Sequence, residues 1–551
     1  MSNLNHHFDI SEINLDNIEK QLRHAFNLSE DVSVEFNKNI SLITNVINIT
    51  ISGKNENDKY LIEKYNLIDI ECECKFKICF ENIIFKHEKN TLLPFIVVFS
   101  NLCFKNYKPK ADDVYKNHIN VLASLHFCNC EFHISESNIF RNITFHETLK
   151  FEKCFFSKVF LFDMCIFYKN FYLETTQSTM GKVEFKNTLF NDTGKIILNN
   201  QENELNFLNV EFHKPFDCFA CNLHNIKQVS FIDVLFKDYC HLSELGERDT
   251  YPSELPIYKQ KEINYKSKVV FKHTVFEKPL NFQNVNFENG FEFAEVNCYK
   301  KVIFSNGVSS LNEDGEREIF LQNSVFKDEV DFSEVSFENK ILHIDKTTFE
   351  KSFSLTMVDN NMSSVNAFGK GLVIKNSFFA GNINLSHCCF NCEVKISDCI
   401  FKGYIKIHGS YFQDKVQFEK NIIDKVISFD ISEFKEEVIF DYTVFNDILS
   451  LLFVIFHKAP KFALAKFTNS ANIQTFNLRI GESNEELNED CYEKENIEST
   501  MNKLGAITDT YRLMKDQAIK NNDLLVATEN KKSELYAREL ELDYCKKILW
   551  Y

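Results

Sequence analysis

The chain has 551 residues and a formal net charge of −17, and its composition is dominated by 57 Phe against one Trp, 14 Gly and 7 Pro. So little glycine disfavours an enzyme built on tight turns and phosphate-binding loops, and the acidic balance disfavours generic binding of nucleic-acid phosphates. The charge is compatible with a plain soluble body and with mimicry of an acidic polymer.

Targeting signals are the next feature that the sequence addresses. The first ten residues, MSNLNHHFDI, lack the basic start and apolar core of a secretory signal. The longest apolar stretch is about nine residues, at 448–456, whereas a membrane span needs about twenty. We therefore expect a soluble, cytoplasmic protein with reduced cysteines, and the abundance of Asn, Lys, Ile and Phe indicates an AT-rich bacterial genome.

Residues 1–75 predict a small α/β cap. A helical stripe follows Ser11, and alternating apolar residues at 32–36 and 46–51 predict two strands. A cap at this point would cover the open edge of the structure that follows. The stripe consists of Ile13, Ile18, Leu22, Ala25 and Phe26.

Residues 76–480 contain a repeat of eleven residues that reads apolar, any, apolar, four residues, Phe. Spacings of two, five and six do not fit one face of a helix, whereas residues two apart in a strand face the same way. Two units make 22 residues, enough for one four-sided coil in which Phe stacks over Phe. One series with this period is Phe379, Phe390, Phe401, Phe412, Ile423, Phe434, Phe445, Phe456 and Phe467, and an upstream block has Phe271, Phe282, Phe293 and Phe304.

A small or polar residue occupies a slot two places before the second Phe of each unit. We expect it to face inward, where a small side chain lets the backbone turn a corner without leaving a void. The slot residues are Ser377, Cys388, Cys399, Ser410, Asn421, Ser432, Thr443 and Ala465, with Cys130, Cys154 and Cys165 upstream.

With this slot, the segments 388–390, 398–401 and 284–287 resemble the pentapeptide-repeat family, in which Phe or Leu is central and a small residue lies two places before it. The resemblance implies a right-handed parallel, quadrilateral β-helix over 76–480. Units here alternate between five and six residues, so a less regular right-handed β-helix is the structural alternative. Insertions are expected at 105–124, 237–268, 305–319 and 358–371, as binding loops or as drifted surface loops.

The C-terminal part changes character. Between 482 and 498 there are eight acidic residues and one Lys, so 481–496 is expected to be an acidic linker. A helical hairpin is predicted at 497–551, with a turn at 521–523. The apolar positions of its first helix include Ile497, Met501, Leu504, Tyr511 and Ala518, and those of its second helix include Leu525, Leu535, Leu542 and Leu549.

This hairpin resembles the helical segment that precedes a two-helix ion-channel unit in larger pentapeptide-repeat proteins. The chain stops where a membrane segment would begin, so the channel is not carried over. The resemblance leaves open a truncated relative, a soluble member that uses the hairpin for docking, and a hairpin that only caps the last coil.

No catalytic, cofactor or metal site is predicted. The pairs Cys218/Cys221 and Cys389/Cys392 have zinc-like spacing but lie far apart along the repeat. His126, His133 and His387 are scattered beside repeat positions and expected to face outward, and the carboxylates Asp430, Glu436, Glu437 and Asp441 are expected on an outer surface of mixed charge without the cleft that paired-carboxylate catalysis needs.

We therefore expect a non-enzymatic binding or scaffolding solenoid whose partner is a protein or a second copy, contacted through the C-terminal helices. No small-molecule substrate, cofactor or direct nucleic-acid binding is expected, and membrane contact only through a partner or a missing C-terminal segment. Two alternatives remain. One is a DNA-mimicking protein that interacts with gyrase, as the fold of small pentapeptide-repeat proteins implies, and the other is the truncated channel relative.

Overall fold

The computed structural model describes residues 15–26, 28, 32–40, 45–52, 60–62, 70–72, 75–81, 83–87, 102–104, 119–134, 138–156, 159–175, 182–198, 203–217, 226–241, 263–265, 267–282, 285–287, 289–304, 317–333, 335, 337, 340–356, 368–468, 470–481 and 494–550. The chain forms two compact units. Unit 1 comprises 1–248 with 265–278, and unit 2 comprises 249–264 with 279–551.

Unit 1 begins with the α/β cap that the sequence predicts. Helix α1 (Leu15–Phe26) buries Ile18 and Leu22, four residues apart on one face. Strands β1 (Ser33–Ile40) and β2 (Asn45–Ser52) are antiparallel, and β2 pairs in parallel with β5 (Lys75–Glu81). The edge strand of the cap thus pairs directly with the first strand of the parallel coils. Ser11 and Ile13, expected at the helix start, lie outside the described residues.

The rest of unit 1 consists of parallel ladders in which each strand pairs with its equivalent one coil later. Phe162, Phe185 and Phe207 lie on one ladder in direct register. The first ladder contains β5, β9 (Ser124–Cys128), β13 (Leu149–Phe156), β16 (Phe171–Thr175) and β18 (Gly194–Ile197); beside it lie β3 (Tyr60–Ile62), β6 (Ile83–His87) and β10 (Glu131–Ile134). The second contains β8 (Ile119–Val121), β11 (Asn138–Arg141), β12 (Ile143–Phe145), β14 (Phe160–Asp163), β15 (Ile166–Phe167), β17 (Lys182–Phe190), β19 (Glu204–Phe212), β21 (Gln228–Phe236), β24 (Lys268–Lys272) and β25 (Val275–Phe276). Two short pairs are β20 (Phe216–Asp217) with β22 (Cys240–His241) and β4 (Ile70–Cys72) with β7 (Leu102–Phe104).

Among its described residues, unit 2 has four long parallel ladders, one for each side of a coil, in addition to the short strand β27 (Val285–Phe287). The first contains β28 (Phe291–Ala294), β31 (Arg317–Gln322), β34 (Lys340–Asp345), β37 (Gly371–Lys375), β41 (Val394–Ser397), β45 (Val416–Glu419) and β49 (Val438–Ile439). The second contains β29 (Asn297–Cys298), β32 (Val325–Phe326), β35 (Thr348–Phe349), β38 (Phe378–Phe379), β42 (Ile400–Phe401), β46 (Ile422–Ile423), β50 (Val444–Phe445) and β53 (Lys466–Phe467). The third contains β26 (Leu280–Asn281), β30 (Val302–Ile303), β33 (Val330–Asp331), β36 (Phe353–Ser354), β39 (Ile383–Asn384), β43 (Ile405–Lys406), β47 (Ile427–Ser428), β51 (Leu449–Leu452) and β54 (Ile473–Phe476), and the fourth contains β40 (Cys389–Phe390), β44 (Tyr411–Phe412), β48 (Glu433–Phe434), β52 (Ile455–Phe456) and β55 (Arg479–Ile480).

The register confirms that two eleven-residue units form one coil. Phe379 pairs with Phe401, and Phe390 pairs with Phe412, each 22 residues further along the chain. The predicted parallel β-solenoid is therefore correct. The five-plus-six alternation is accommodated because each unit crosses two sides and one corner of the coil.

Columns of Phe rings form the core of the coils. On the fourth side of unit 2, Phe390, Phe412 and Phe434 stack with centroid distances of 4.6 and 4.5 Å and interplanar angles of 7° and 6°. All three are at most 2% exposed. Burying a side chain of this size contributes about 1.5–3 kcal/mol, so each coil gains its stability chiefly from contacts with the coils above and below it.

The small inward slot does more than fill space. Ser432 Oγ donates to the carbonyl oxygen of Ile407 in the preceding coil at 2.7 Å, and accepts from the amide of Ser410 at 3.1 Å. Asn421 makes the equivalent pair of bonds with the Ile396 carbonyl and the Cys399 amide. A short polar side chain is therefore placed here because it satisfies two buried backbone groups that the strand ladder leaves unpaired.

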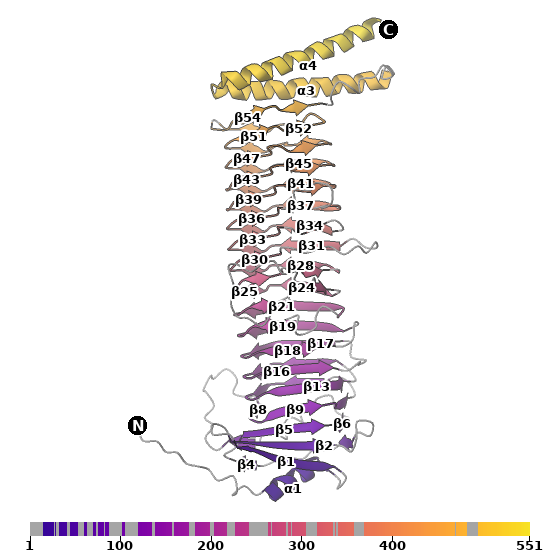
Figure 1. Cartoon of the computed structure of the whole chain (residues 1–551), viewed down its shortest axis with the longest axis vertical. Coiled ribbons are helices and arrows are strands. Elements are labelled where there is room, and N and C mark those ends of the chain that lie inside the picture. Colours follow the sequence, from indigo (N-terminus) through magenta and orange to yellow (C-terminus); the bar gives the residue numbers. More distant parts are fainter. Residues whose placement is uncertain are drawn as a thin grey trace, which may run out of the picture. The chain divides into compact units, whose positions relative to one another are not determined.

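Unit 2 ends in the predicted helical hairpin, α3 (Lys494–Lys520) and α4 (Leu524–Trp550). Figure 1 shows the two helices side by side across the end of the last coils, next to β54. At the turn, Asn522 has φ of 59°, and Asp523 caps α4 by accepting from the Val526 amide at 3.1 Å.

Several expectations fall largely outside the described residues. They include most of the acidic linker and most of the four insertions. The described ends of the insertions form coil strands, for example Ile119–Val121 and Arg317–Gln322, and α3 already begins at Lys494.

Candidate binding surface at the end of unit 2

The carboxylates that the sequence singled out connect neighbouring coils. Asp430 accepts from Ser450 Oγ at 2.7 Å and from the Leu452 amide at 3.0 Å. Asp441 accepts from the amide of Ala463, one coil on, at 2.8 Å. These acids are half-buried on the outer surface, as expected, and their bonds are to the next coil rather than to one another.

The other acids of this region form ion pairs with lysines one coil further on. Glu437 pairs with Lys461 at 2.9 Å, and the hydrogen bond lowers the pKa of Glu437 below its ordinary value. Glu436 pairs in the same way with Lys458. Opposite charges therefore alternate along the stacking direction, whereas mimicry of a nucleic-acid duplex needs rows of like charge.

The cysteines and histidines are dispersed. Cys130, Cys154 and Cys165 are fully buried in their slots, and burial raises the pKa of Cys154 and Cys165. Cys392 is buried and Cys389 half-buried. Cys218, Cys221 and the side chain of His133 lie outside the described residues; His126 is half-buried and hydrogen-bonds Glu152 at 3.0 Å, and His387 is exposed.

Among the described residues, no three His, Cys, Asp or Glu side chains gather so as to hold a metal ion.

One surface feature departs from the repeat. The residue just before each slot turns the corner of the coil with φ near +55°, the left-handed region that Asn, Asp and Gly tolerate best. In unit 2 these corner residues are Glu295, Asn323, Lys346, Asn376, His387, Asp398, Gly409 and Lys420, then Ile431, Tyr442, Phe453 and Leu464, and finally Asn477.

Four consecutive corners before Asn477 are bulky, apolar and exposed. Ile431, Tyr442, Phe453 and Leu464 have φ of 56–60° and are 56, 54, 48 and 67% exposed. A bulky residue in this conformation costs about 1–2 kcal/mol relative to the right-handed region, and a β-branched residue such as Ile431 is rare there. Backbone sterics disfavour the left-handed conformation of these residues, and the hydrophobic effect disfavours the exposure of their side chains.

Backbone bonds stack these side chains into two columns. The Ile431 amide donates to Leu452 O, and the Phe453 amide donates to Phe476 O, so Phe453 lies one coil after Ile431, and Asn477 takes the corner one coil after Phe453. The rings of Phe453 and Phe476 meet edge to face at 5.2 Å, and Phe476 is 51% exposed. Tyr442 and Leu464 form the second column, half a coil further along the chain and therefore at the opposite corner of the coil. We call the two together the apolar corner columns.

Hydrogen bonds connect the C-terminal hairpin to the last coils of unit 2. Thr510 Oγ1 donates to Pro460 O at 3.2 Å, and Asn521 Nδ2 donates to Ala471 O at 3.1 Å. Asn530 of α4 donates to Thr475 at 3.3 Å. Both helices therefore have a fixed position over the last coil, and they cover its open strand edge.

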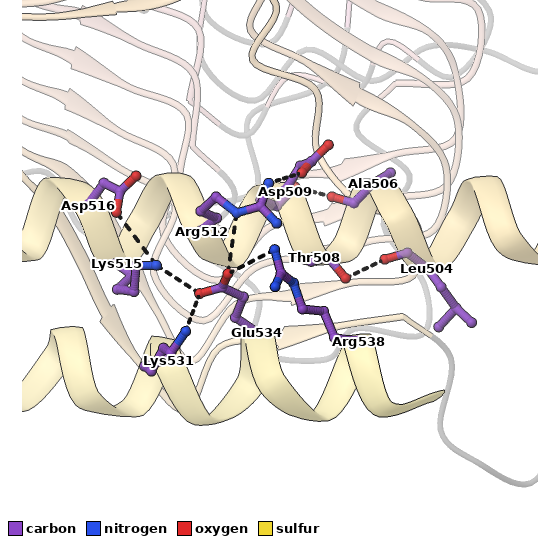
Figure 2. Close-up of polar contacts among 11 residues, drawn as sticks. Leu504, Ala506, Thr508, Asp509, Arg512, Lys515, Asp516, Lys531, Glu534 and Arg538 are labelled. Carbon is purple, nitrogen blue, oxygen red and sulfur yellow. Dashed lines mark hydrogen bonds and ion pairs between the residues drawn. The ribbon is translucent and has the colours of Figure 1, made fainter. Parts of the chain in front are cut away.

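A buried carboxylate joins the two helices (Figure 2). Glu534 of α4 is 2% exposed and accepts from Lys515 at 2.9 Å and from Arg512 at 3.3 Å, both on α3. Lys531 and Arg538, one turn to either side, lie 3.6 and 3.9 Å away. The hydrogen bond from Lys515 and the surrounding cations lower the pKa of Glu534, so the carboxylate is ionised at neutral pH.

The face of α4 that packs inward differs from the one that the leucine pattern indicates. Ala527, Asn530, Glu534 and Ala537 are buried. Leu525, Leu535 and Leu542 are instead 74, 50 and 60% exposed. The helix therefore has a second, apolar face in the part of the chain that is described.

Sequence reasoning missed the corner columns, although a signal for them exists. The residue before each slot is polar or Gly in the coils from Asn376 to Lys420, and the change to Ile431 breaks that rule. It also missed Glu534, because no local pattern says which acid of a helix will be buried by another helix.

Comparison with known proteins yields no match among family models, curated proteins or solved structures. None of the described helices has a stretch long and apolar enough to cross a membrane.

Proposed function

We propose that this chain is a non-enzymatic scaffold of the pentapeptide-repeat type, and that it binds a protein partner at the end of unit 2. The observation that carries the proposal is the run of four consecutive corners occupied by Ile431, Tyr442, Phe453 and Leu464. Each residue combines backbone strain with exposure of apolar surface, and such combinations are concentrated at functional sites. The pentapeptide-repeat assignment is supported by the slot and Phe spacing alone.

A protein is the partner that these two exposed apolar columns fit. Apolar and aromatic side chains dominate the energetic centres of protein interfaces. The rigid coils hold the side chains in fixed positions, which lowers the entropic cost of binding. The C-terminal hairpin, fastened to the same coils, is a second contact surface for a protein or another copy of the chain.

The test is a pull-down from lysate of the source organism with three forms of the intact chain. One form is unaltered, and the second carries Ile431→Asn, Tyr442→Asn, Phe453→Asn and Leu464→Asn. The matched control carries His387→Asn and Lys420→Asn, at two polar corners of the preceding coils. Asn tolerates the left-handed conformation, so all three should fold, and circular dichroism verifies this.

We expect at least one protein to be retained by the unaltered and control forms and lost from the fourfold variant. Equal recovery of every protein by all three forms would contradict the proposal. Turnover of a substrate by the purified chain would overturn its non-enzymatic part.

A further inference from the structure

The outer face of α4 offers a second, independent surface. It is defined here by Leu525, Lys532, Leu535, Glu539 and Leu542, and we call it the outer strip. These residues recur at steps of three, four or seven, so they lie along one side of the helix, away from the buried Ala527, Asn530, Glu534 and Ala537. The three leucines are at least half exposed.

The charges on the outer strip are unused within the described part of the chain. Lys531 and Arg538 contact Glu534, and Lys546 contacts Asp543, but no ion pair there includes Lys532 or Glu539. The strip therefore combines exposed leucines with one cation and one anion that are free to pair with another molecule.

We infer that the outer strip binds the outer strip of a second copy, with the two α4 helices antiparallel about a two-fold axis beside Leu535. This inference deepens the proposed scaffold role by naming the occupant of the hairpin's outer face. A two-fold contact is self-complementary. If residue i of one copy contacts residue j of the other, then residue j of the first copy contacts residue i of the second.

The spacing of the strip satisfies that requirement. Lys532 lies three residues before Leu535, and Glu539 lies four residues after it, which is about 4.5 and 6 Å along the helix axis. An antiparallel pair therefore brings Lys532 of each copy level with Glu539 of the other, on both sides of a central Leu535–Leu535 contact.

The positions of the other two leucines also fit this two-fold axis. Leu542 lies about 10 Å beyond the axis and Leu525 about 15 Å before it. Across the pair the two come within about one helical turn, so every leucine of the strip gains an apolar neighbour. A parallel pair would instead place Lys532 on Lys532 and Glu539 on Glu539, which is repulsive.

The experiment measures the mass of the intact chain over a concentration series by sedimentation equilibrium. We expect a monomer–dimer equilibrium, with a dissociation constant raised at least tenfold by the double variant Leu535→Glu/Leu542→Glu. Ile519→Glu, an equally drastic change at a 51% exposed apolar residue of α3, is the matched control and should dimerise normally. Circular dichroism confirms that each variant keeps its helices.

A charge swap tests the antiparallel register. Lys532→Glu or Glu539→Lys alone should weaken the dimer, because each creates two like-charge contacts, and the double swap should restore it. An unaltered chain that is monomeric up to its solubility limit, or a dimer indifferent to the leucine variants, overturns the inference.

The corner columns are untouched in these variants. Loss of the dimer with retained partner capture, or the reverse, therefore separates failure of this inference from failure of the proposed function.

Discussion

The polar slot supports a quantitative prediction, for which Ser432→Ala is the cleanest perturbation. Ser432 is 1% exposed, and its hydroxyl makes the two bonds that link the Ile407 carbonyl with the Ser410 amide. Alanine keeps the slot small but removes both bonds. If the two backbone groups stayed unpaired, the cost would be about 1–3 kcal/mol for each of them.

The neighbouring coil indicates a lower cost. The slot residue one coil after Ser432 is Val454, whose side chain has no hydrogen-bond acceptor. The amide of Ser432 therefore donates to the carbonyl oxygen of Phe429, three residues earlier in the chain, at 3.1 Å. Ile407 likewise lies three residues before Ser410, so its carbonyl oxygen has the same position relative to the Ser410 amide. The two groups freed by the substitution can therefore pair with each other, and we expect a net loss of about 1 kcal/mol.

Amide hydrogen exchange at Ser410 is the appropriate assay, because long repeat arrays do not unfold in one step and local stability must be read locally. A loss of about 1 kcal/mol accelerates exchange about fivefold. Ala465→Ser, which adds a hydroxyl above the Thr443 amide where that amide now donates to Phe440 O at 3.2 Å, should slow exchange at Thr443. Complete loss of protection at Ser410, or a cost of ~3 kcal/mol or more, would refute the compensating bond.

Three further predictions concern the core, the hairpin and the thiols. Phe412→Ala empties the stacked position between Phe390 and Phe434 and should cost about 3–5 kcal/mol in local stability, measured by exchange in the adjoining coils; a cost below that of Ser432→Ala would show that the stack contributes little. The lowered pKa of Glu534 means that its contribution is complete above the unfolded value of about 4.5 and is lost as pH falls through the lower folded value. The protection factors of the hairpin amides, which correct for the intrinsic pH dependence of exchange, should therefore fall below about pH 4.5 in the unaltered chain but not in Glu534→Gln, and equal profiles of protection against pH would exclude this role. The buried thiols of Cys154 and Cys165 should resist alkylation in the folded protein at mildly alkaline pH and react after denaturation; rapid native labelling, detected by mass spectrometry, would contradict their burial.

The coils could be predicted because their determinants are local and repeated. The eleven-residue period, the inward Phe and the small slot recur with the same spacing, so one rule places many residues, and the register of Phe379 on Phe401 follows from it. The hairpin was predictable for a similar reason, since its turn at 521–523 and its helical periodicity are local features.

The candidate surfaces were less accessible to sequence reasoning. Leu535 and Leu542 fit an inward-facing stripe, yet Glu534 and Asn530 occupy the buried side of α4, because Lys515, Arg512 and Thr475 supply their partners from other elements. A charge can be buried only where opposite charges surround it, and that arrangement exists only after the helices have packed.

The sequence by itself determined the solenoid, its 22-residue coil and the capped ends, because each depends on spacing along the chain. Only the tertiary structure decided which face of α4 meets solvent, that the slot hydroxyls bridge successive coils, and that Ile431 and its three successors stand exposed in a strained conformation. Those properties depend on groups far apart in sequence, whose contacts form only when one coil lies on the next.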